Sequence, residues 1–359
     1  SSDVCSSDLM RIINDIHLGT LRRAGTTPAS QQALTDYIQN SFKFLLEASD
    51  GGHLVINGDL FDGFTVDTRT VLWAYEVLVS WLAGPFNSLT LVAGNHDWNP
   101  RGDKLSSFHL LTSLLTIAYP DRVQVIDHVH GLTSISDSVA AIPHMPNQDL
   151  FDLELEAATK VTEASGFLLL HANYDNNFAV ESDHSLNVSP AQAEKLVNAG
   201  WHLVFAHEHQ YRAPRPGVTV VGNQFPTSVA DCLGNDYKQF IEITNGEMKW
   251  AKCWSRDPVF IDTDWRHLDM PFDGIQFIRV AGTAKAEETD QVLTAINTLR
   301  KRHSAFVISN AVRIEGMAGM DELANLNMEE VQTYDVLSAL LEELTPEEGK
   351  VVKDLLAEV

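Results

Sequence analysis

The sequence predicts an α/β protein with buried strands, followed by a smaller α+β unit. Short, almost continuously apolar runs recur along the first two thirds of the chain, as is typical of strands covered on both faces. Longer amphipathic segments separate several of these runs and have the apolar spacing of helices. Hydrophobic residues make up 44% of the 359 residues and charged residues 21%, which is ordinary for a globular protein and argues against a disordered or fibrous chain.

Each apolar run defines one expected strand of the first unit. In chain order, these strands are expected at 11–13, 54–56, 89–92, 167–170, 203–205, 217–222 and 239–243. Helices are expected at 30–46 and 71–82, where apolar residues recur at steps of three and four. The alternation of the two kinds of segment favours an α/β architecture.

A second unit is expected to open at Asp257-Pro258 and to form a capping domain over residues 255–326. Its expected elements are a strand at 275–280, a helix at 287–302 and a strand at 305–308. A small α+β domain is the simplest interpretation of this order.

Residues 327–359 are expected to form a helical hairpin with an apolar stripe on each helix. The first stripe consists of Val331, Tyr334, Leu337, Leu340, Leu341 and Leu344. Thr345 and Pro346 then carry the signals of a new helix start. The surroundings are acidic, because residues 321–359 hold eleven acids and two lysines, a net charge of 2 − 11 = −9. Short helices need another surface for stability, which is either this chain's own cap or a partner.

Composition excludes several classes of protein. The net charge is 25 − 49 = −24, which disfavours unaided electrostatic binding to nucleic acid. Three widely spaced cysteines exclude a disulfide scaffold and a cysteine zinc site, and a reducing, cytoplasmic location is expected. No apolar run approaches the roughly 18 residues that span a bilayer. Residues 1–9 are polar and without periodicity, and are expected to be a leader or cloning scar.

Polar clusters of metal-ligand types follow five of the apolar runs. Their members are Asp15 and His17; Asp59 and Asp62; Asn95, His96 and Asp97; His171; and His207 and His209. Residues i and i+2 of an extended strand end point the same way, so the paired ligands are expected to converge. Ligands of open α/β sheets gather beyond the carboxyl ends of the strands. Each cluster alone is a common turn or surface motif, but the five together predict one site.

In this order, the motifs resemble those of the calcineurin-like metallophosphoesterases. The matching segments are D-x-H at 15–17, G-D-x-x-D at 58–62, G-N-H-D at 94–97, the single His171, and H-x-H at 207–209. The resemblance implies a two-sheet sandwich flanked by helices, with a catalytic domain over residues 10–254. Within that superfamily, Ile142-Pro143-His144 and the appended unit are similar to the SbcD-type DNA-repair nuclease subunit, in its phage-like version.

The resemblance also implies two divalent metal ions, with manganese the expected metal. One ion would be held by Asp15, His17, Asp59 and His209, and the other by Asp59, Asn95, His171 and His207, with Asp59 as the bridge. Imidazole and carboxylate ligands suit Mn²⁺, Fe or Zn²⁺. His96 is expected to protonate the leaving group, and Asp97 to orient the imidazole of His96.

Substrate contacts are expected from two places. The resemblance assigns Asp62 and His144 to the site, and the basic residues Arg300, Lys301 and Arg302 are expected to steer a DNA backbone. A solvated basic helix end explains those three equally well. The implied partners are DNA and an SbcC-like ATPase, which residues 328–359 would bind. A homodimer is the remaining alternative for the oligomeric state.

Three departures from the family pattern and two rival functions accompany this interpretation. Asp62 stands where archaeal and eukaryotic nuclease subunits often carry a second histidine, so an acid relay of two histidines is not implied here. Ala206 stands where glycine usually precedes H-x-H, which requires a backbone without positive φ there. Asn14 replaces a common serine beside Asp15, and is expected to lie behind the ligands. The first rival is a small-molecule phosphodiesterase or phosphatase of the same superfamily, which the net charge favours. The second is a non-catalytic scaffold, which the complete set of ligands argues against.

Overall fold

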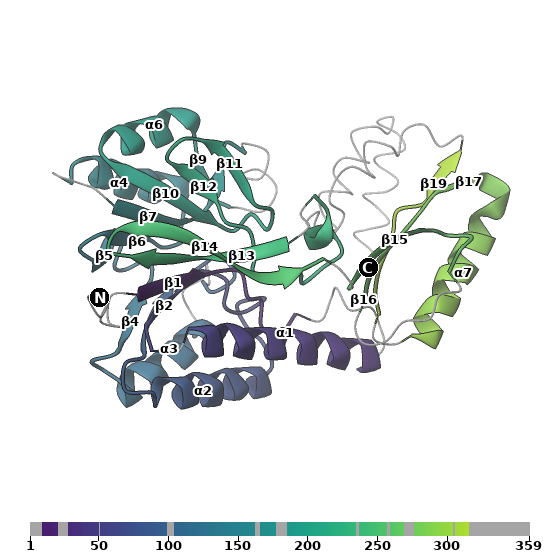
Figure 1. The fold of residues 1–359 in the computed structure, drawn as a ribbon, viewed down its shortest axis with the longest axis horizontal. Helices are drawn as coiled ribbons and strands as arrows, with labels where there is room; N and C mark the ends of the chain where they lie inside the picture. Colours follow the sequence, from purple (N-terminus) through teal and green to yellow (C-terminus); the bar gives the residue numbers. More distant parts are fainter. Residues whose placement is uncertain are drawn as a thin grey trace, which may run out of the picture.

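The computed structural model describes residues 9–20, 28–49, 51–98, 104–161, 166–176, 185–234, 237–256, 259–268, 276–303 and 306–315 (Figure 1). The first strand and the last described strands lie in different parts of the molecule. Among the described residues, two six-stranded sheets and five helices make up most of the main body, and a smaller three-stranded sheet with one helix stands beside it.

The first sheet of the body has the order β14-β13-β1-β2-β3-β4. Its strands are β1 (Leu9–Ile13), β2 (His53–Asn57), β3 (Ser88–Val92), β4 (Val123–Ile126), β13 (Tyr237–Thr244) and β14 (Glu247–Ser255). The strands β1 to β4 are parallel, and β13 runs antiparallel to β1. The carboxyl ends of β1, β2 and β3 therefore lie at one edge of this sheet.

The second sheet has the order β11-β12-β10-β7-β6-β5. Its strands are β5 (Thr133–Ser136), β6 (Val139–Ile142), β7 (Gly166–His171), β10 (Trp201–Ala206), β11 (Arg212–Arg215) and β12 (Val218–Val220). The central four strands are parallel, and antiparallel strands close both edges.

Helices cover the outer face of each sheet. The first sheet carries α1 (Pro28–Ala48), α2 (Thr68–Leu82) and α3 (Ser107–Ala118), and the second carries α4 (Gln148–Thr159) and α6 (Pro190–Asn198) (Figure 1). One apolar cluster lies between the two sheets, and includes Ile12, Val55, Leu169 and Val204. A second cluster lies between the first sheet and its helices, and a third lies between the second sheet and its helices. The body is thus a four-layer sandwich, which confirms the predicted fold class.

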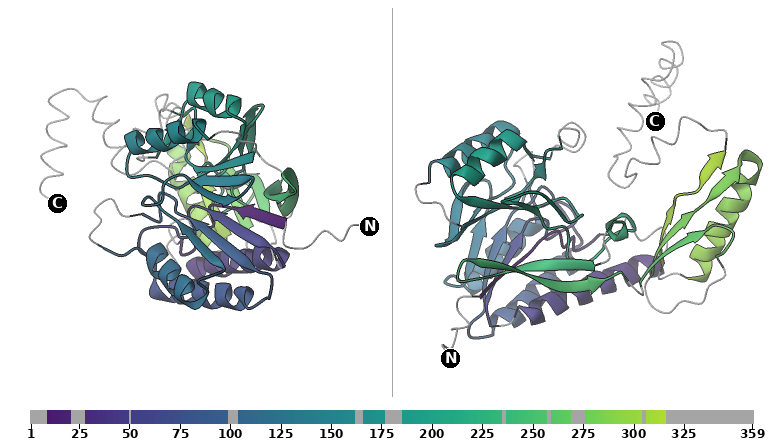
Figure 2. Two further views of the ribbon diagram at one scale, coloured as in Figure 1. Left: turned by 90° about the vertical axis from the view of Figure 1, so that its left-hand side faces the viewer. Right: turned by 45° about the horizontal axis from the view of Figure 1, so that its top comes forward.

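The appended unit has a three-stranded parallel sheet with one helix on it (Figure 2). Its elements are β15 (Phe260–Asp264), β16 (Gln276–Ala281), β17 (Thr283–Lys285), α7 (Thr289–Arg302), β18 (Phe306–Asn310) and β19 (Arg313–Glu315). Val292, Ile296 and Leu299 of α7 pack on one face of the sheet. The other face meets α1, where the rings of Tyr37 and Phe277 lie 5.6 Å apart.

The strands expected at the short apolar runs are all present, as are the two expected helices of the body and the helix of the appended unit. The helices α3, α4 and α6, the inner strand β6 and the edge strands were not predicted. β1 begins at Leu9, one residue inside the segment that was set aside as a leader. The predicted hairpin at 327–359 lies outside the described residues. No helix in the described part of the chain combines the length and apolar character that a membrane span needs.

Candidate metal centre

The predicted ligands come together where strands of both sheets end. Three sets of side chains place a ligand atom of each member within 4.8 Å of the others. These sets are Asp15, His17 and His209; Asp59, His171 and His207; and His17, Asp59 and His96. Asp59 and His17 each belong to two sets, so the three form one continuous cluster.

The convergence comes from left-handed backbone and not from strand alternation, which corrects the geometric part of the prediction. Four of the six non-glycine residues with positive φ in the described chain are predicted ligands: Asp15 (φ 52°), His17 (52°), Asp59 (49°) and His207 (81°). Each costs roughly 1 kcal/mol or more, and such strain concentrates at functional sites. Ala206 is not among them, so alanine is tolerated before His207 as the sequence required.

The motif glycines make room for these ligands. A Cβ on Gly58, which has a φ of +86°, would lie 1.9 Å from Nδ1 of His171, and a Cβ on Gly94 would lie 2.1 Å from Oδ1 of Asp59. Any side chain at either position would displace a predicted ligand. The glycines of G-D-x-x-D and G-N-H-D are thus required by packing at the centre.

The first metal position would lie among Asp15, His17, His209 and Asp59. Nε2 of His17 lies 3.1 Å from Nε2 of His209 and 3.9 Å from Oδ2 of Asp59. Asp15 accepts hydrogen bonds at Oδ2 from the side chain of Asn14 and from the backbone N–H of His207. Its Oδ1 is buried, without a hydrogen-bond partner among the described residues.

The second position would lie among Asn95, His171, His207 and Asp59. Oδ1 of Asn95 lies 2.9 Å from Nε2 of His171 and 3.0 Å from Nδ1 of His207. Nε2 of His171 also lies 3.3 Å from Oδ1 of Asp59. Oδ2 of Asp59 thus faces the first set and Oδ1 faces the second, as a bridging carboxylate requires.

These residues fit divalent cations. Oδ1 of Asp15 is a buried carboxylate oxygen without a hydrogen-bond donor among the described residues. Burying such an oxygen costs free energy unless a cation binds it. Carboxylate, amide and imidazole ligands suit Mn²⁺, Fe or Zn²⁺. Nδ1 of His171 faces the backbone carbonyl of Asn57 at 3.2 Å, so Nδ1–H donates there and Nε2 is directed to the cluster.

Charge in the cluster keeps Asp59 ionised and His171 protonated when no cation is bound. Burial alone would lower the pKa of His171, but the Asp59 carboxylate beside it raises that pKa to about 9. Burial opposes ionisation of Asp59, but the imidazoles of His171, His96 and His17 hold its pKa well below the usual value. Because a ligating imidazole must lose its proton at the metal-facing nitrogen, a cation competes with protons here.

His96 differs from the ligand imidazoles in its access to solvent. Its side chain is 36% exposed, against 2% for His17 and 0% for His171. Nδ1 lies 2.7 Å from the backbone carbonyl of Asp62, which can only accept, so Nδ1 carries a proton. Nε2 faces the cluster, 3.9 Å from Oδ2 of Asp59. This nitrogen is placed to meet a substrate bound at the metals.

Asp97 holds the loop and not the imidazole of His96, which corrects the predicted role. Its carboxylate is buried and accepts hydrogen bonds from the backbone N–H groups of Gly94, at 2.9 Å, and Phe61, at 3.4 Å. Burial and the nearby charge of Asp59 raise the pKa of Asp97 to about 6. The orienting group for His96 is the Asp62 carbonyl, which sequence could not reveal because it is a backbone atom.

Asp231 is a functional residue that the sequence analysis missed. Its Oδ1 accepts from Nδ1 of His209 at 2.9 Å, which directs Nε2 of His209 to the first metal position. Its Oδ2 accepts from Thr227, Ser228 and Asn223. The segment after β12 thus supports a carboxylate behind a predicted ligand.

Lys238 of β13 adds a buried cation behind the same ligand. Its Nζ donates to the backbone carbonyl of His209 at 2.8 Å. Burial lowers the pKa of Lys238, and the charge of Asp231 opposes that shift. No motif surrounds Asp231 or Lys238, so only the fold brings them to the centre.

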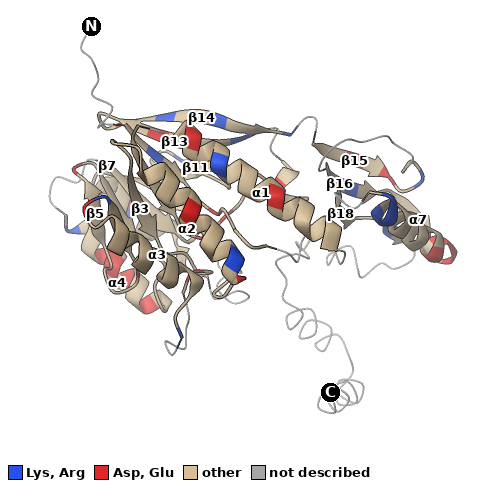
Figure 3. Cartoon of the chain, turned by 90° about the horizontal axis from the view of Figure 1, so that it is seen from below, with Lys and Arg blue, Asp and Glu red and all other residues tan. Residues whose placement is uncertain are grey.

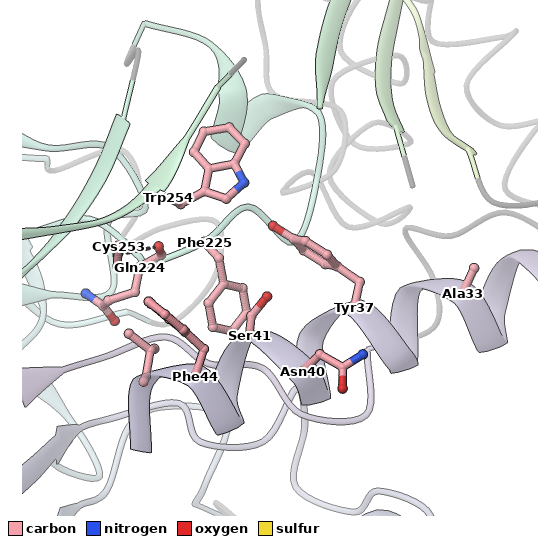
Figure 4. Close-up of a pocket in the computed structure, with 10 residues that line it drawn as sticks. Ala33, Tyr37, Asn40, Ser41, Phe44, Gln224, Phe225, Cys253 and Trp254 are labelled. Carbon is pink, nitrogen blue, oxygen red and sulfur yellow. Dashed lines mark hydrogen bonds between the residues drawn. The ribbon is translucent and has the colours of Figure 1, made fainter. Parts of the chain in front are cut away.

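Asn14 lies behind the ligands as expected. Its side chain donates to Asp15 and to the Gly222 carbonyl, and its backbone N–H donates to Oε1 of Gln224 at 2.7 Å. Gln224 also borders a cavity of about 570 Å³ between α1 and β14 (Figure 4). The cavity is lined by Ala33, Tyr37, Asn40, Ser41, Phe44, Leu45, Gln224, Phe225, Cys253 and Trp254. No predicted ligand belongs to this lining.

The residues assigned to substrate fall in three different environments. Oδ1 of Asp62 lies 3.3 Å from Nδ1 of His17, and the Asp62 carbonyl accepts from Nδ1 of His96. His144 is buried beside the loop after β3, and burial lowers its pKa to about 3. Arg300, Lys301 and Arg302 form the exposed last turn of α7, on the side of the appended sheet opposite to α1 (Figure 3).

The model of the calcineurin-like phosphoesterase family matches residues 11–238. This range covers more than half of the chain and includes every predicted metal ligand, so the chain belongs to the calcineurin-like phosphoesterase family. It is accordingly a phosphoester hydrolase that depends on divalent metal ions.

The solved structures that match this chain are distant from it. The protein TT1561 of Thermus thermophilus is 9% identical with a TM-score of 0.41, and the match covers 69% of this chain and 99% of that one. The nuclease MPE of Pseudomonas putida is 18% identical with a TM-score of 0.22, and the match covers 46% of this chain and 62% of that one. At these TM-scores neither carries an argument about function. A comparison with curated proteins finds no match.

The chemistry follows from the arrangement of side chains. Two bound cations would polarise the phosphoryl group and supply a nucleophile at neutral pH. Asp59 would be shared between the two positions, and Asp15, Asn95 and the four predicted ligand histidines would hold the ions from their outer sides. With Nδ1–H of His96 held by the Asp62 carbonyl, Nε2 is directed to the cluster, where it would face the leaving-group oxygen of a bound phosphoester.

Proposed function

We propose that this chain is the nuclease subunit of a DNA-repair or recombination complex, which hydrolyses DNA phosphodiester bonds with two manganese ions. It works with an SbcC-like ATPase that binds residues 328–359. The observation that carries the chemistry is the shared position of Asp59 in two ligand sets, with the exposed imidazole of His96 beside it. The choice of a diester of DNA rests on the motif resemblance and on the appended unit.

The basic turn of α7 supports DNA as the substrate. Arg300, Lys301 and Arg302 are consecutive and exposed in a chain whose net charge is −24. Phosphate contacts of this kind position nucleic acid without reading its sequence. Acidic surroundings would still repel DNA, so a basic partner is needed for tight binding to duplex.

A small-molecule phosphodiesterase or phosphatase is the second candidate, and the overall acidity favours it. Such a substrate would need the metals and His96, but not the appended unit. The two candidates therefore differ in whether residues of α7 affect turnover.

A panel assay with Mn²⁺ tests the proposal. Linear duplex, single-stranded DNA, cyclic nucleotides and bis-p-nitrophenyl phosphate are compared with the purified chain. We expect cleavage of DNA as well as of the chromogenic diester. Turnover of cyclic nucleotides with no cleavage of DNA, alone or with the ATPase, would contradict the proposal.

Charge reversal of the α7 turn separates the two candidates further. The triple change Arg300→Glu, Lys301→Glu and Arg302→Glu should weaken duplex cleavage by several-fold, and more at low salt, because exposed charges are screened. The chromogenic diester serves as the internal control, and its turnover should be unchanged. Equal loss on both substrates would assign the effect to misfolding.

Deletion of residues 328–359 tests the partner. The truncated chain should keep metal-dependent cleavage of the chromogenic diester, but lose co-purification with the ATPase and ATP-stimulated digestion of duplex. Unchanged affinity for the ATPase would place the docking surface elsewhere.

A further inference from the structure

Trp98 is the exception among the seven tryptophans of this chain. The other six each belong to one of the four hydrophobic clusters of the described residues: Trp73, Trp81, Trp201, Trp250, Trp254 and Trp265. Trp98 belongs to none of them, although its side chain has the largest apolar area of any residue type and normally contributes to a core. It is also only partly buried. Core packing therefore does not explain this indole.

The position of Trp98 ties it to the catalytic loop. It follows directly after the segment that carries Asn95, His96 and Asp97. Its ring lies 6.2 Å from that of His144, at an interplanar angle of 50°, and 5.8 Å from that of His128, at 64°. The backbone N–H of His144 donates to the Ala93 carbonyl at 2.9 Å, at the start of the same loop. The indole, two residues along the chain from His96, thus lies against His128 and His144.

The chemistry of this patch suits an uncharged planar group. His144 is 6% exposed, and its burial together with the nearby His171 keeps the imidazole neutral at physiological pH. Trp98 carries no charge, so neither residue can bind phosphate as an ion pair. An aromatic face stacks well on a heteroaromatic ring, because both are apolar and flat. Stacking of this kind is tolerant of sequence.

We propose that Trp98 is a stacking platform for the nucleobase next to the scissile phosphate, and so a specificity residue for nucleotide diesters. The proposal rests on the proposed function and deepens it. The base would lie on the indole while the adjacent phosphate meets the metals and its leaving oxygen faces His96. His144 and His128 hold the indole in place from its sides, and act as positioning residues.

Oligonucleotides with a single abasic nucleotide provide the test. Cleavage at an ordinary nucleotide is compared with cleavage at a tetrahydrofuran abasic nucleotide in the same sequence, with Mn²⁺ and the full chain. The wild type should prefer the ordinary nucleotide in kcat/KM by roughly 5- to 150-fold, which is the range expected for one stacked base. In Trp98→Ala this preference should fall towards one, mainly through KM, whereas Trp98→Phe should keep part of it.

Two controls separate the possible failures. Phe86→Ala removes a 67% exposed aromatic ring that lies outside the ligand loops, and should leave the preference unchanged. Metal content of Trp98→Ala is measured in parallel, and loss of metal would show that the variant is misfolded, in which case Trp98→Phe decides alone. A wild type that cleaves ordinary and abasic positions equally would overturn the stacking role and leave the nuclease proposal intact. A wild type that cleaves only the chromogenic diester would overturn the nuclease proposal itself.

Discussion

The parallel strands of the sandwich and those of the appended sheet end in different ways. Asp59, after β2, is 2% exposed, has positive φ and faces imidazoles from three other segments. Asp264, at the end of β15, is 35% exposed and pairs with its neighbour Arg266 at 3.5 Å. The residue with positive φ beside Asp264 is Gly282, at φ +108°. Glycine adopts this backbone conformation without steric strain because it has no Cβ.

This difference shows that parallel topology alone does not make a metal site. The sandwich and the appended unit both bring the ends of parallel strands to one edge. Among the described residues, the strained and buried side chains lie at the edge of the sandwich, where hydrogen bonds from behind support His171 and His209. Strain of roughly 1–3 kcal/mol at each such residue is kept only where the surroundings fix it. A set of variants can test which of these features matters most.

Asp59→Asn should have the largest effect. It removes the one carboxylate that faces both metal positions, and metal ions supply several kcal/mol of transition-state stabilisation. We expect loss of bound metal and a fall in kcat of roughly 10³-fold or more. Metal analysis and diester turnover of the same preparation measure both. A variant that keeps two ions and half of its activity would show that Asp59 is not the bridge.

His96→Ala should keep metal but lose turnover. A general acid contributes roughly 10²–10⁴-fold, and the exposed imidazole of His96 is held by a backbone carbonyl and not buried among the ligands. Because Nε2 of His96 also lies near Asp59, metal stoichiometry decides between an acid and a ligand. Metal loss equal to that of Asp59→Asn would make His96 a ligand.

Asp231→Asn should have an intermediate effect, because it weakens the support of one ligand. Changes behind a metal ligand typically cost roughly 10–100-fold in metal affinity or activity. We expect a loss in this range at the position that His209 serves, measured by calorimetric titration with Mn²⁺. Asp264→Asn is the matched control in the appended sheet, and should leave the titration unchanged. An Asp231→Asn titration identical to that of the wild type would remove Asp231 from the centre.

His53→Gln should change only the pH dependence of stability, at the opposite end of β2. His53 faces the hydroxyls of Ser88, at 2.7 Å, and Thr90, at 2.9 Å, and burial lowers its pKa from 6.5 to about 4. The unfolded chain therefore binds a proton between these values and the folded chain does not. The neutral, buried His53 therefore contributes its full share to the free energy of unfolding above pH 6.5. That share is lost as the pH falls from 6.5 towards 4, by up to about 3 kcal/mol.

Urea unfolding of wild type and His53→Gln at several pH values measures that difference. The wild type should lose more stability than the variant on acidification from about pH 7 to about pH 5. Parallel curves would show that the imidazole is not held neutral. Metal binding by His53→Gln at neutral pH should match the wild type, because His53 is no ligand.

The predicted ligands lie together in the fold, whereas the groups that support them were not predicted. Asp15, His17, Asp59 and His171 follow apolar runs in a fixed order, so strand ends place them together whatever the loops do. The left-handed backbone of three of them is invisible in residue types, since aspartate and histidine adopt it only where the fold imposes it.

Asp231, Lys238 and the Asp62 carbonyl were beyond prediction for a related reason. The first two lie 22 and 29 residues from His209 and carry no spacing signal, and the third is a backbone atom. Asp97 shows the opposite error, because adjacency to His96 in sequence suggested a contact that the turn directs elsewhere. Trp98 could have been noticed only by comparing all seven tryptophans in the folded chain.

The number of metal ions per chain tests the central claim most directly. Metal-free protein is titrated with Mn²⁺ while binding is followed by calorimetry and the ions by electron paramagnetic resonance. A centre bridged by Asp59 should bind two ions per chain, whose spectra show magnetic coupling at full loading, and Asp59→Asn should abolish that coupling. A single ion per chain, or two ions with uncoupled spectra in the wild type, would contradict a shared two-metal centre.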